Sequence, residues 1–283
     1  FNNRNSSRSR RAWNRCKIMK ILITGVSGLI GNLLAVHLKK QGHEITALNR
    51  SKINGYNSIQ ADISNLEDIK PAFNNKDLVI HMSAYTAPPN SKHSPTDEEQ
   101  WQGNLNTNII GVYNIFEASR LAKIPRVIFG SSGAAIGGYS KIFPYNKIAE
   151  GKYDEIPKSY DKISHSEVRP LGLYGAAKVW GEAIARHFSD AYGLSILCLR
   201  IGSVRKEDYP NNPHRFSYYL SHKDIIQMVE KCIKAPKELL YDIFMACSDN
   251  KYSYYDLEHA ENIIQYLPED SAESAINLYK KDN

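Results

Sequence analysis

The sequence lacks the marks of a membrane protein, of a disulfide-stabilised protein and of a zinc protein. No apolar run approaches the ~18 residues of a membrane-spanning helix. Its four cysteines are widely spaced, and no two of them form a Cys-x-x-Cys pair (Cys16, Cys198, Cys232 and Cys247). We therefore expect no membrane partner, free thiols in a reducing, cytoplasmic compartment, and neither a disulfide frame nor a metal site.

Acidic residues are missing from the first 18 positions, which hold six Lys or Arg. The whole chain has 36 Lys and Arg against 30 Asp and Glu, so the rest of it is balanced at 30 of each. A neutral body argues against nucleic-acid binding by the folded domain. The basic tail is compatible with an organelle transit peptide or a polyanion-binding arm, but we favour a disordered upstream extension of a chain that starts at Met19.

Internal repeats are absent too, and a different pattern organises the 283 residues. Short β-branched apolar segments alternate with segments of helical periodicity. This alternation is typical of an α/β fold, a Rossmann-type doubly wound parallel sheet. Strands are predicted at 20–25, 43–48, 77–84, 126–132 and 195–200, and helices at 29–42, 65–73, 98–122 and 174–192.

The pattern loosens after residue 200. A helix near 222–234, a strand near 240–246 and a helix near 255–265 are expected there. We interpret them as a small C-terminal substrate-binding cap over the carboxyl edge of the sheet, where ligands bind in this fold class. The chain is therefore divided into a Rossmann domain at 19–200 and a mainly cap-forming part at 201–283.

Three glycines follow the first predicted strand with the spacing Gly-x-x-Gly-x-x-Gly (Gly25, Gly28 and Gly31 in "TGVSGLIG"). A tight turn at this place lets the backbone approach a pyrophosphate at the N-terminus of the next helix. The motif predicts dinucleotide binding.

The residues after the second predicted strand indicate which dinucleotide is preferred. An acidic side chain there would bind the ribose 2′-hydroxyl of NAD(H), whereas this chain has Asn49 and Arg50. An amide followed by a guanidinium can accept a 2′-phosphate, so NADP(H) is slightly favoured over NAD(H). Asp62 either contacts the adenine or caps the following helix.

Tyr174 and Lys178 stand four residues apart in "YGAAK", on one face of a predicted helix. Together with the other motifs they resemble the extended short-chain dehydrogenase/reductase (NAD-dependent epimerase/dehydratase) superfamily. The resemblance also rests on "TGVSGLIG", Asp62-Ile63, "VIHMSA", "NTNIIGVYN", "VIFGSS" and "LRIGS", in the family's order over roughly residues 20–205. It implies an NAD(P)-dependent enzyme in which Tyr174 and Lys178 are the catalytic pair.

The resemblance also implies a site and a mechanism. A phenol with a pKa of ~10 is a poor base near neutrality. Lys178 and the positive nicotinamide ring would therefore lower the pKa of Tyr174. Ser132 would donate a hydrogen bond to the reacting oxygen, and Lys178 would hold the nicotinamide ribose. Asn108 would stabilise the helix backbone near Lys178, or simply pack its own helix. The implied cofactor-binding residues are Gly25, Ser27, Gly28, Leu29, Ile30, Gly31, Asn49, Arg50, Asp62, Ile63, Met82, Ser83, Ala84, Tyr174, Lys178 and Ile201.

The C-terminal half is most similar to uronate dehydrogenases, which oxidise the C1 hydroxyl of a hexuronic acid to the lactone. By that resemblance Arg215 would bind the substrate carboxylate through its guanidinium group. The other implied substrate contacts are Thr86, Ser132, Gly133 and Ser203.

Two departures from that family concern the substrate. Gly133-Ala134 stands where uronate dehydrogenases have an Asn-His pair that contacts sugar hydroxyls, and a changed polar contact changes which sugar is accepted. The loop 138–170 is also longer, and could form a lid, bind a larger or phosphorylated sugar, or decorate the surface.

The sequence therefore favours an NAD(P)-dependent sugar oxidoreductase acting at C1 of an aldose or hexuronic acid. An epimerase or dehydratase of a nucleotide-linked sugar is the main rival, and a non-catalytic cofactor-binding sensor is a further one. A small sugar is the expected partner. By analogy with the superfamily, the helices at 98–122 and 174–192 would pair across a two-fold axis into a homodimer.

Overall fold

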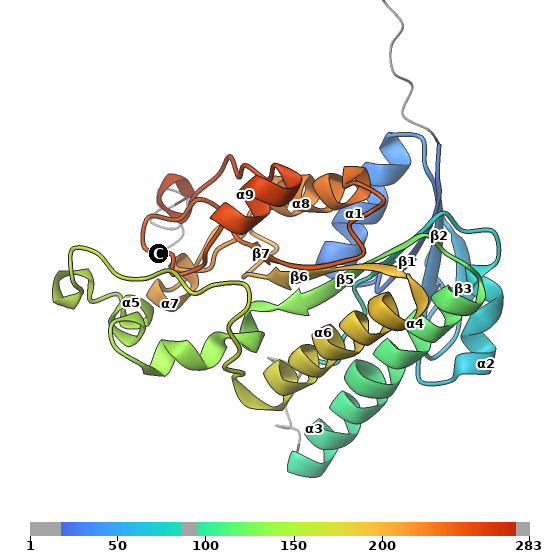
Figure 1. Cartoon of the computed structure of the whole chain (residues 1–283), viewed down its shortest axis with the longest axis horizontal. Coiled ribbons are helices and arrows are strands. Elements are labelled where there is room, and N and C mark those ends of the chain that lie inside the picture. Colours follow the sequence, from blue (N-terminus) through green and yellow to red (C-terminus); the bar gives the residue numbers. More distant parts are fainter. Residues whose placement is uncertain (1–17, 87–95, 276–283) are drawn as a thin grey trace, which may run out of the picture.

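A parallel sheet with helices on both faces dominates the computed structural model, which describes residues 18–86 and 96–275 (Figure 1). Within these ranges the sheet has seven strands in the order β3-β2-β1-β4-β5-β6-β7. All neighbouring strands are parallel. They are β1 (Lys20–Thr24), β2 (Glu44–Asn49), β3 (Asn57–Gln60), β4 (Leu78–His81), β5 (Arg126–Ser132), β6 (Ser195–Ile201) and β7 (Tyr241–Ala246). The predicted doubly wound α/β fold is confirmed.

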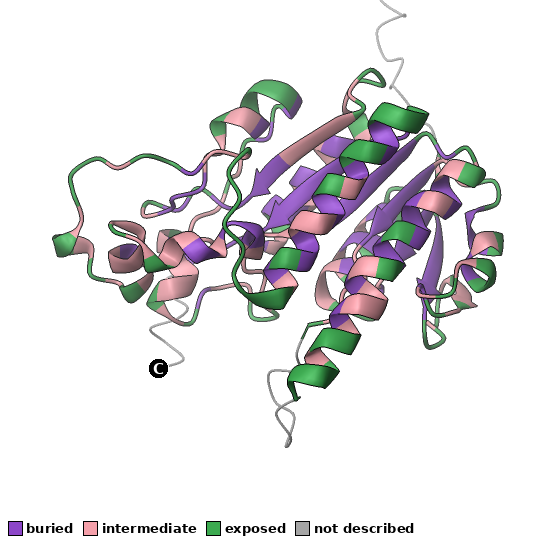
Figure 2. Ribbon diagram, turned by 60° about the horizontal axis from the view of Figure 1, so that its bottom comes forward, coloured by how far each residue is buried: buried purple, intermediate pink, exposed green. Residues whose placement is uncertain are grey.

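Most of the helices divide between the two faces of the sheet. They are α1 (Leu29–Lys40), α2 (Leu66–Ile69), α3 (Asp97–Gly103), α4 (Gly111–Leu121), α5 (Tyr145–Glu150), α6 (Gly172–Tyr192), α7 (Pro213–Phe216), α8 (His222–Lys234) and α9 (Glu258–Ile264). Because side chains alternate along a strand, Ile21 and Ile23 pack with α1, α8 and α9, while Leu22 packs with α4 and α6. Figure 2 shows the result: each long helix is buried on its sheet-facing side and exposed on the other.

The predicted helix at 98–122 is continuous but not uniform. A π-helical segment, η2 (Asn104–Ile110), joins α3 to α4. A single extra residue per turn rotates the following side chains, and such segments are frequent at functional sites. The short strand β3 carries polar residues and no apolar run, so the periodicity of the sequence did not define its bounds.

The C-terminal elements correct one expectation. The strand and helix expected in the cap, β7 and α8, instead extend the sheet and cover it, with β7 paired to β6 and α8 packed beside α1. The segment before α6, which includes α5, contributes instead to a separate cluster of tyrosines with residues near 252–255. The loop 138–170 is therefore packed rather than a surface decoration, although the division at residue 200 stays a prediction.

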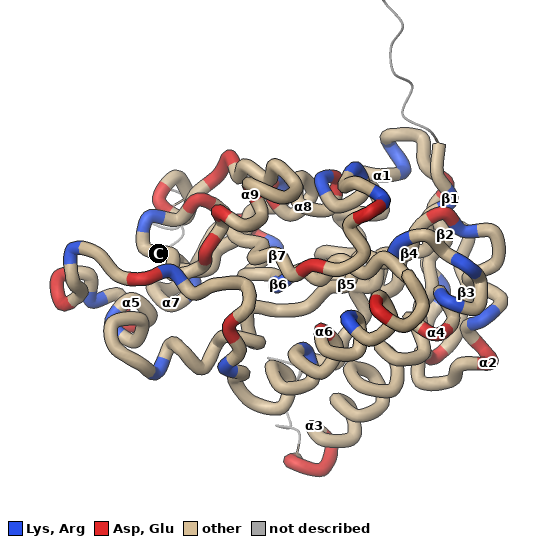
Figure 3. Tube along the Cα trace, viewed as in Figure 1, with Lys and Arg blue, Asp and Glu red and all other residues tan. Residues whose placement is uncertain are grey.

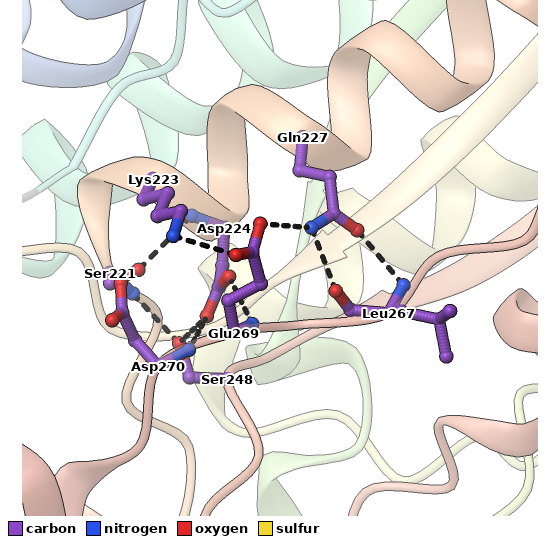
Figure 4. A network of polar contacts seen from close by, with 8 residues as sticks. All are labelled: Ser221, Lys223, Asp224, Gln227, Ser248, Leu267, Glu269 and Asp270. Atoms are coloured by element: carbon purple, nitrogen blue, oxygen red, sulfur yellow. Dashed lines mark hydrogen bonds and ion pairs between the residues drawn. The ribbon is translucent and has the colours of Figure 1, made fainter.

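A buried carboxylate fastens the segment after α9 to α8 (Figure 4). Asp224, in the first turn of α8, accepts hydrogen bonds from the backbone amides of Glu269 and Asp270 and from the Ser248 hydroxyl. Burial raises the pKa of Asp224, and these three donors oppose that shift. Gln227 adds two bonds to Leu267 one turn later. The C-terminal segment is thus held along the α8 side of the sheet.

Charges and cysteines agree with the expectations where they can be compared. Figure 3 shows acidic residues at the start of α3 and both signs interspersed elsewhere along the trace. Cys198, Cys232 and Cys247 are buried free thiols. Cys16 and the basic tail lie outside the described residues. In the ranges 18–86 and 96–275, no helix is long and apolar enough to cross a membrane.

Candidate active site

The glycine loop between β1 and α1 is packed too closely for side chains. Gly25 has a φ of +75°, and a Cβ there would lie 2.8 Å from the carbonyl carbon of Met82. A Cβ at Gly31 would lie 2.2 Å from the carbonyl oxygen of Gly25. Glycines therefore let α1 begin directly against the end of β1. Such a turn suits a pyrophosphate at the helix N-terminus, so the loop fits a dinucleotide.

A cleft of about 350 Å³ lies beside this loop, at the carboxyl ends of β1, β2 and β4. It brings together many of the predicted cofactor residues: Gly25, Ser27, Gly28, Asn49, Arg50, Asp62, Ile63, Met82, Ser83 and Ala84. Leu29, Ile30 and Gly31 form the adjoining first turn of α1. Thr86, predicted to contact substrate, also lines this cleft. Leu48, Ala61, Tyr85 and Thr107 line it without having been predicted.

Asn49 does more than border the cleft. Its Oδ1 accepts a hydrogen bond from the Val26 amide at 3.1 Å, and its Nδ2 donates to the Ser27 hydroxyl at 2.9 Å. The side chain is buried. Asn49 therefore holds the glycine loop to the end of β2, a role that the sequence did not reveal.

Asp62 and Arg50 line the same cleft. Asp62 Oδ1 accepts from both the amide and the hydroxyl of Ser64, at 2.9 and 2.8 Å. The helix cap itself is Asn65, whose side chain accepts from the Glu67 amide. Asp62 thus stabilises the turn before α2 and does not cap that helix.

Asn108 binds the loop after β4, a contact that the sequence did not reveal. Its Oδ1 accepts from the Tyr85 amide and its Nδ2 donates to the Tyr85 carbonyl, both at 2.9 Å. Nδ2 also donates to Asn104 Oδ1 at 2.8 Å. These bonds differ from the predicted contact with the helix backbone near Lys178. They fix the strand-to-loop turn that forms one wall of the cleft.

Ser132, Tyr174 and Lys178 meet at the end of β5, as the sequence predicts. Tyr174 and Ser132 share a side-chain hydrogen bond. Lys178 Nζ lies 5.4 Å from the centre of the Tyr174 ring. The ammonium group is buried and donates to the Gly130 carbonyl at 2.7 Å. The hydroxyl of Ser132 at the end of β5 thus lies beside the phenol and the amine of α6.

The pKa shifts at this site come mainly from burial. Burial raises the pKa of Tyr174, and the Ser132 hydrogen bond opposes that rise. The predicted lowering also involves the positive nicotinamide ring of the oxidised cofactor, so it stays a prediction. Burial also lowers the pKa of Lys178 to about 8, so its amine is still mostly protonated at neutral pH. The protein side chains alone therefore keep Tyr174 a phenol.

A buried ion pair between Arg200 and Glu182 joins α6 to the sheet. Arg200 of β6 donates to both carboxylate oxygens of Glu182, at 2.9 and 2.8 Å. Glu182 also accepts from the Ser131 hydroxyl at 2.6 Å. Because Glu182 lies one turn after Lys178, these bonds fix the register of α6 on β5 and β6. Burying such a pair is costly unless its hydrogen bonds are complete.

A second, smaller cavity of about 160 Å³ begins at Ser132. Aromatic residues form much of its wall. The lining comprises Ser132, Gly133, Ala134, Gly137, Leu171, Ile201, Gly202, His214, Tyr218, Tyr254 and Tyr255. None of these residues, all from the described ranges, is Asp, Glu, Lys or Arg. Burial lowers the pKa of His214 and favours its neutral form.

The predicted substrate residues are divided between these places. Ser132 and Gly133 line the small cavity, together with Ile201, which was predicted to bind cofactor. Ser203 pairs with the backbone of Tyr218 just beyond it. Arg215 lies on α7, where its charge acts on His214 and Tyr218. Neither Ser203 nor Arg215 is part of the cavity wall in the described structure.

One group of residues with metal-ligating atoms was not predicted. His165, Asp242 and His259 hold such atoms within 4.8 Å of one another, and this is the only such group in the described chain. The two imidazole rings are stacked 3.6 Å apart at 11°, and His259 Nε2 is hydrogen-bonded to Asp242 at 2.8 Å. Nearly parallel rings direct their lone pairs side by side rather than toward one point. The arrangement suits packing of the loop before α6 against α9.

Comparisons with known proteins agree with a fold that binds a nucleotide cofactor. A profile of the NAD dependent epimerase/dehydratase family matches residues 21–231, and the chain belongs to this family. The uronate dehydrogenase of Agrobacterium fabrum is 27% identical over 260 residues, which cover 90% of this chain and 86% of that protein. The L-arabinose 1-dehydrogenase (NAD(P)(+)) of Haloferax volcanii is 27% identical over 270 residues, 91% of this chain and 99% of the relative.

A solved structure extends the similarity to three dimensions. The crystal structure of uronate dehydrogenase from Agrobacterium tumefaciens matches with a TM-score of 0.76 at 25% identity, covering 94% of this chain and 90% of the other. The chain is thus an NAD(P)-dependent oxidoreductase of the epimerase/dehydratase family.

Proposed function

We propose that the protein oxidises the C1 hydroxyl of an aldose or a hexuronic acid, with the hydride passing to a nicotinamide cofactor. The observation that carries this proposal is the position of Ser132, which lines a small aromatic cavity and also bonds Tyr174. A sugar in that cavity places its reacting hydroxyl beside a base and a hydrogen-bond donor. Glycine loop, cleft and cavity then succeed one another along the carboxyl edge of the sheet, as in other doubly wound enzymes.

The reaction removes a hydride from C1 and a proton from the hydroxyl group on C1, and leaves a lactone carbonyl. When bound, the nicotinamide ring accepts the hydride. Tyr174, once ionised to the phenolate, takes the hydroxyl proton, and Ser132 donates a hydrogen bond to the same oxygen. Lys178 supplies positive charge one turn from the phenol, which opposes the effect of burial on the pKa of Tyr174.

The size of the cavity favours a monosaccharide over a nucleotide-linked sugar. At about 160 Å³ it is smaller than the roughly 300–1,000 Å³ of sites that enclose drug-sized ligands. Sugar C–H groups pack well on tyrosine faces. The uncharged wall suits a neutral aldose, and Arg215 on neighbouring α7 is the group that would accommodate a uronate carboxylate.

Cofactor choice rests on Arg50. The family is NAD dependent, and Asn49 is occupied with the glycine loop. Arg50 borders the cleft with an exposed guanidinium, which can pair with a 2′-phosphate. If NADP is accepted, Arg50→Ala should weaken NADP binding about tenfold or more and leave NAD binding nearly unchanged. Equal effects on both cofactors would contradict this role.

A homodimer is part of the proposal. Apolar side chains are exposed on the α3–η2–α4 helix (Trp101, Tyr113 and Leu121) and on the neighbouring α6 (Leu173 and Tyr192). A second copy can cover both helices across a two-fold axis. A light-scattering mass of two chains is expected, and a monomer at micromolar concentration would contradict it.

The function itself is tested by initial rates of reduced-nicotinamide formation. D-glucuronate, D-galacturonate, L-arabinose and D-glucose are each offered with NAD and with NADP. Net reduction with one of these sugars, lost in Tyr174→Phe, is expected. Failure with all of them, together with interconversion of a nucleotide sugar without net reduction, would favour the epimerase or dehydratase alternative. Binding without turnover of any sugar would favour the cofactor sensor.

A further inference from the structure

Tyr255 belongs to the wall of the small cavity, although nothing in the sequence motifs singled it out. Its backbone is held in place: the amide donates to the Ser253 hydroxyl at 3.1 Å, and the residue forms a β-bridge with Ile163. The residue is 4% exposed, and its ring lies roughly parallel to that of Tyr218, with the ring centres 6.5 Å apart. Tyr255 is therefore a fixed part of the wall.

The hydroxyl of Tyr255 fills the space that a side chain at residue 133 would occupy. A Cβ placed on Gly133 would lie only 1.9 Å from Tyr255 Oη. Gly133 directly follows Ser132 at the end of β5. Glycine at this position thus lets a phenol from the far end of the chain reach the residue next to the catalytic serine.

This hydroxyl makes no hydrogen bond to any residue in the ranges 18–86 and 96–275, although its ring is buried. Burial raises the pKa of Tyr255 far above that of an ordinary phenol. The O–H therefore remains a donor over the whole working pH range. Tyr255 lines the cavity, so an oxygen of a ligand bound there can accept a hydrogen bond from this donor.

We propose that Tyr255 is a specificity-determining residue whose hydroxyl binds the C2 hydroxyl of the sugar. The proposal rests on the function proposed above. If Ser132 bonds the oxygen on C1, the hydroxyl on the adjoining carbon lies toward the next residue, Gly133. Tyr255 Oη is the polar group placed there. The enzyme thus recognises the C2 hydroxyl through the phenol of Tyr255, which occupies the space left by the missing side chain of Gly133.

The test is a double-mutant-type cycle in which the Tyr255 hydroxyl and the C2 hydroxyl of the sugar are removed singly and together. Kcat/KM is measured for the parent and for Tyr255→Phe with D-glucose, D-galactose and L-arabinose and with the 2-deoxy form of each. Removing either hydroxyl alone should lower kcat/KM about tenfold, the usual size for one hydrogen bond. Removing both should cost little more than removing one. Full activity of Tyr255→Phe, or losses that multiply, would overturn the proposal.

Tyr252→Phe is the matched control. It removes a hydroxyl from the same segment, but Tyr252 stacks on Tyr153 at 3.8 Å and lies outside the cavity wall. Its kinetics should equal those of the parent. A loss like that of Tyr255→Phe would mean that any change in this segment disturbs the site, which would overturn the assignment to Tyr255.

Binding separates this proposal from the proposed function. If the parent oxidises no sugar, the same cycle is run by calorimetry with NADH present. Binding of a full sugar that Tyr255→Phe weakens about tenfold supports the contact while the proposed reaction fails. Equal binding by both proteins overturns the contact, and absence of sugar binding overturns both.

The close approach itself has a readout that needs no substrate. Gly133→Ala should lower the melting temperature because its methyl group meets Tyr255 Oη. The same substitution should cost less in Tyr255→Phe, which lacks that atom. Identical losses in the two backgrounds would contradict the placement of the hydroxyl.

Discussion

At the scale of single residues, Asn49 links two parts of the cofactor cleft that are distant in sequence. Its amide bonds both Val26 and Ser27, so the glycine loop and the end of β2 form one unit. A loop fixed before binding loses less entropy when a ligand arrives. We therefore expect Asn49 to favour cofactor binding through the shape of the loop.

Asn49→Ala should therefore weaken NAD(H) binding roughly tenfold, because it leaves the buried Val26 amide without its acceptor. The dissociation constant for NADH is measured by fluorescence titration. Asn54→Ala, in the loop between β2 and β3, is the control and should bind as the parent does. Unchanged affinity of Asn49→Ala would show that the loop holds its shape unaided.

Local sequence identified Ser132, Tyr174 and Lys178 because their spacing and neighbours lie within short motifs. It did not identify Tyr255 or the loop-binding role of Asn49, since both depend on contacts between distant segments. Nor did it give the effect of burial on the pKa of Tyr174, which depends on how deeply the folded chain encloses the phenol. The residue types of the site could be predicted from short motifs, whereas the contacts between distant segments and the depth of burial could not.

At the scale of elements, the π-helical segment η2 is the least expected feature. It places Asn108 under the loop after β4, where three hydrogen bonds join it to Tyr85 and Asn104. Helical periodicity predicted the helix but not the segment, because periodicity averages over several turns. The strand β7 and the helix α8 were predicted at the right places in the sequence. Their packing in the sheet layers was not predicted, because short elements carry no signal of which layer they join.

Asn108→Ala should lower the free energy of unfolding by about 1–3 kcal/mol, since it leaves the Tyr85 amide and carbonyl without their partner. Urea unfolding measures this loss. Asn106→Ala is the matched control on the same segment, because its side chain accepts one exposed bond from Gln102. A loss in Asn108→Ala no larger than the control's would contradict the stabilising role of the bonds between Asn108 and Tyr85.

At the scale of the whole molecule, buried His81 couples stability to pH. Its Nδ1 lies 2.7 Å from the Thr24 hydroxyl, and its Nε2 has no hydrogen-bond partner in the described structure. Burial, aided by the charge of Lys178, lowers the pKa of His81 from 6.5 to about 3. The unfolded chain therefore binds a proton between these pH values that the folded chain does not. Stability is full above pH 6.5 and falls as the pH is lowered toward 3.

The expected loss from His81 is about 1 kcal/mol between pH 6.5 and 5.5, approaching ~1.4 kcal/mol for each further unit. Urea unfolding at several pH values measures the slope. His81→Gln should have a shallower slope, and His187→Gln, at an exposed position of α6, should keep the parent's. Equal slopes in all three would contradict the account. If His81→Gln does not fold, the NMR titration of His81 in the parent gives the same answer.

The central claim is that Tyr174, Ser132 and Lys178 carry out a net oxidation of a sugar. Its most direct test is the amount of reduced nicotinamide formed for each sugar molecule consumed, in the parent and in Tyr174→Phe. The account predicts equal amounts in the parent and a rate roughly 100- to 10,000-fold lower in the variant. Sugar conversion without net reduction, or a Tyr174→Phe rate equal to the parent's, would contradict it.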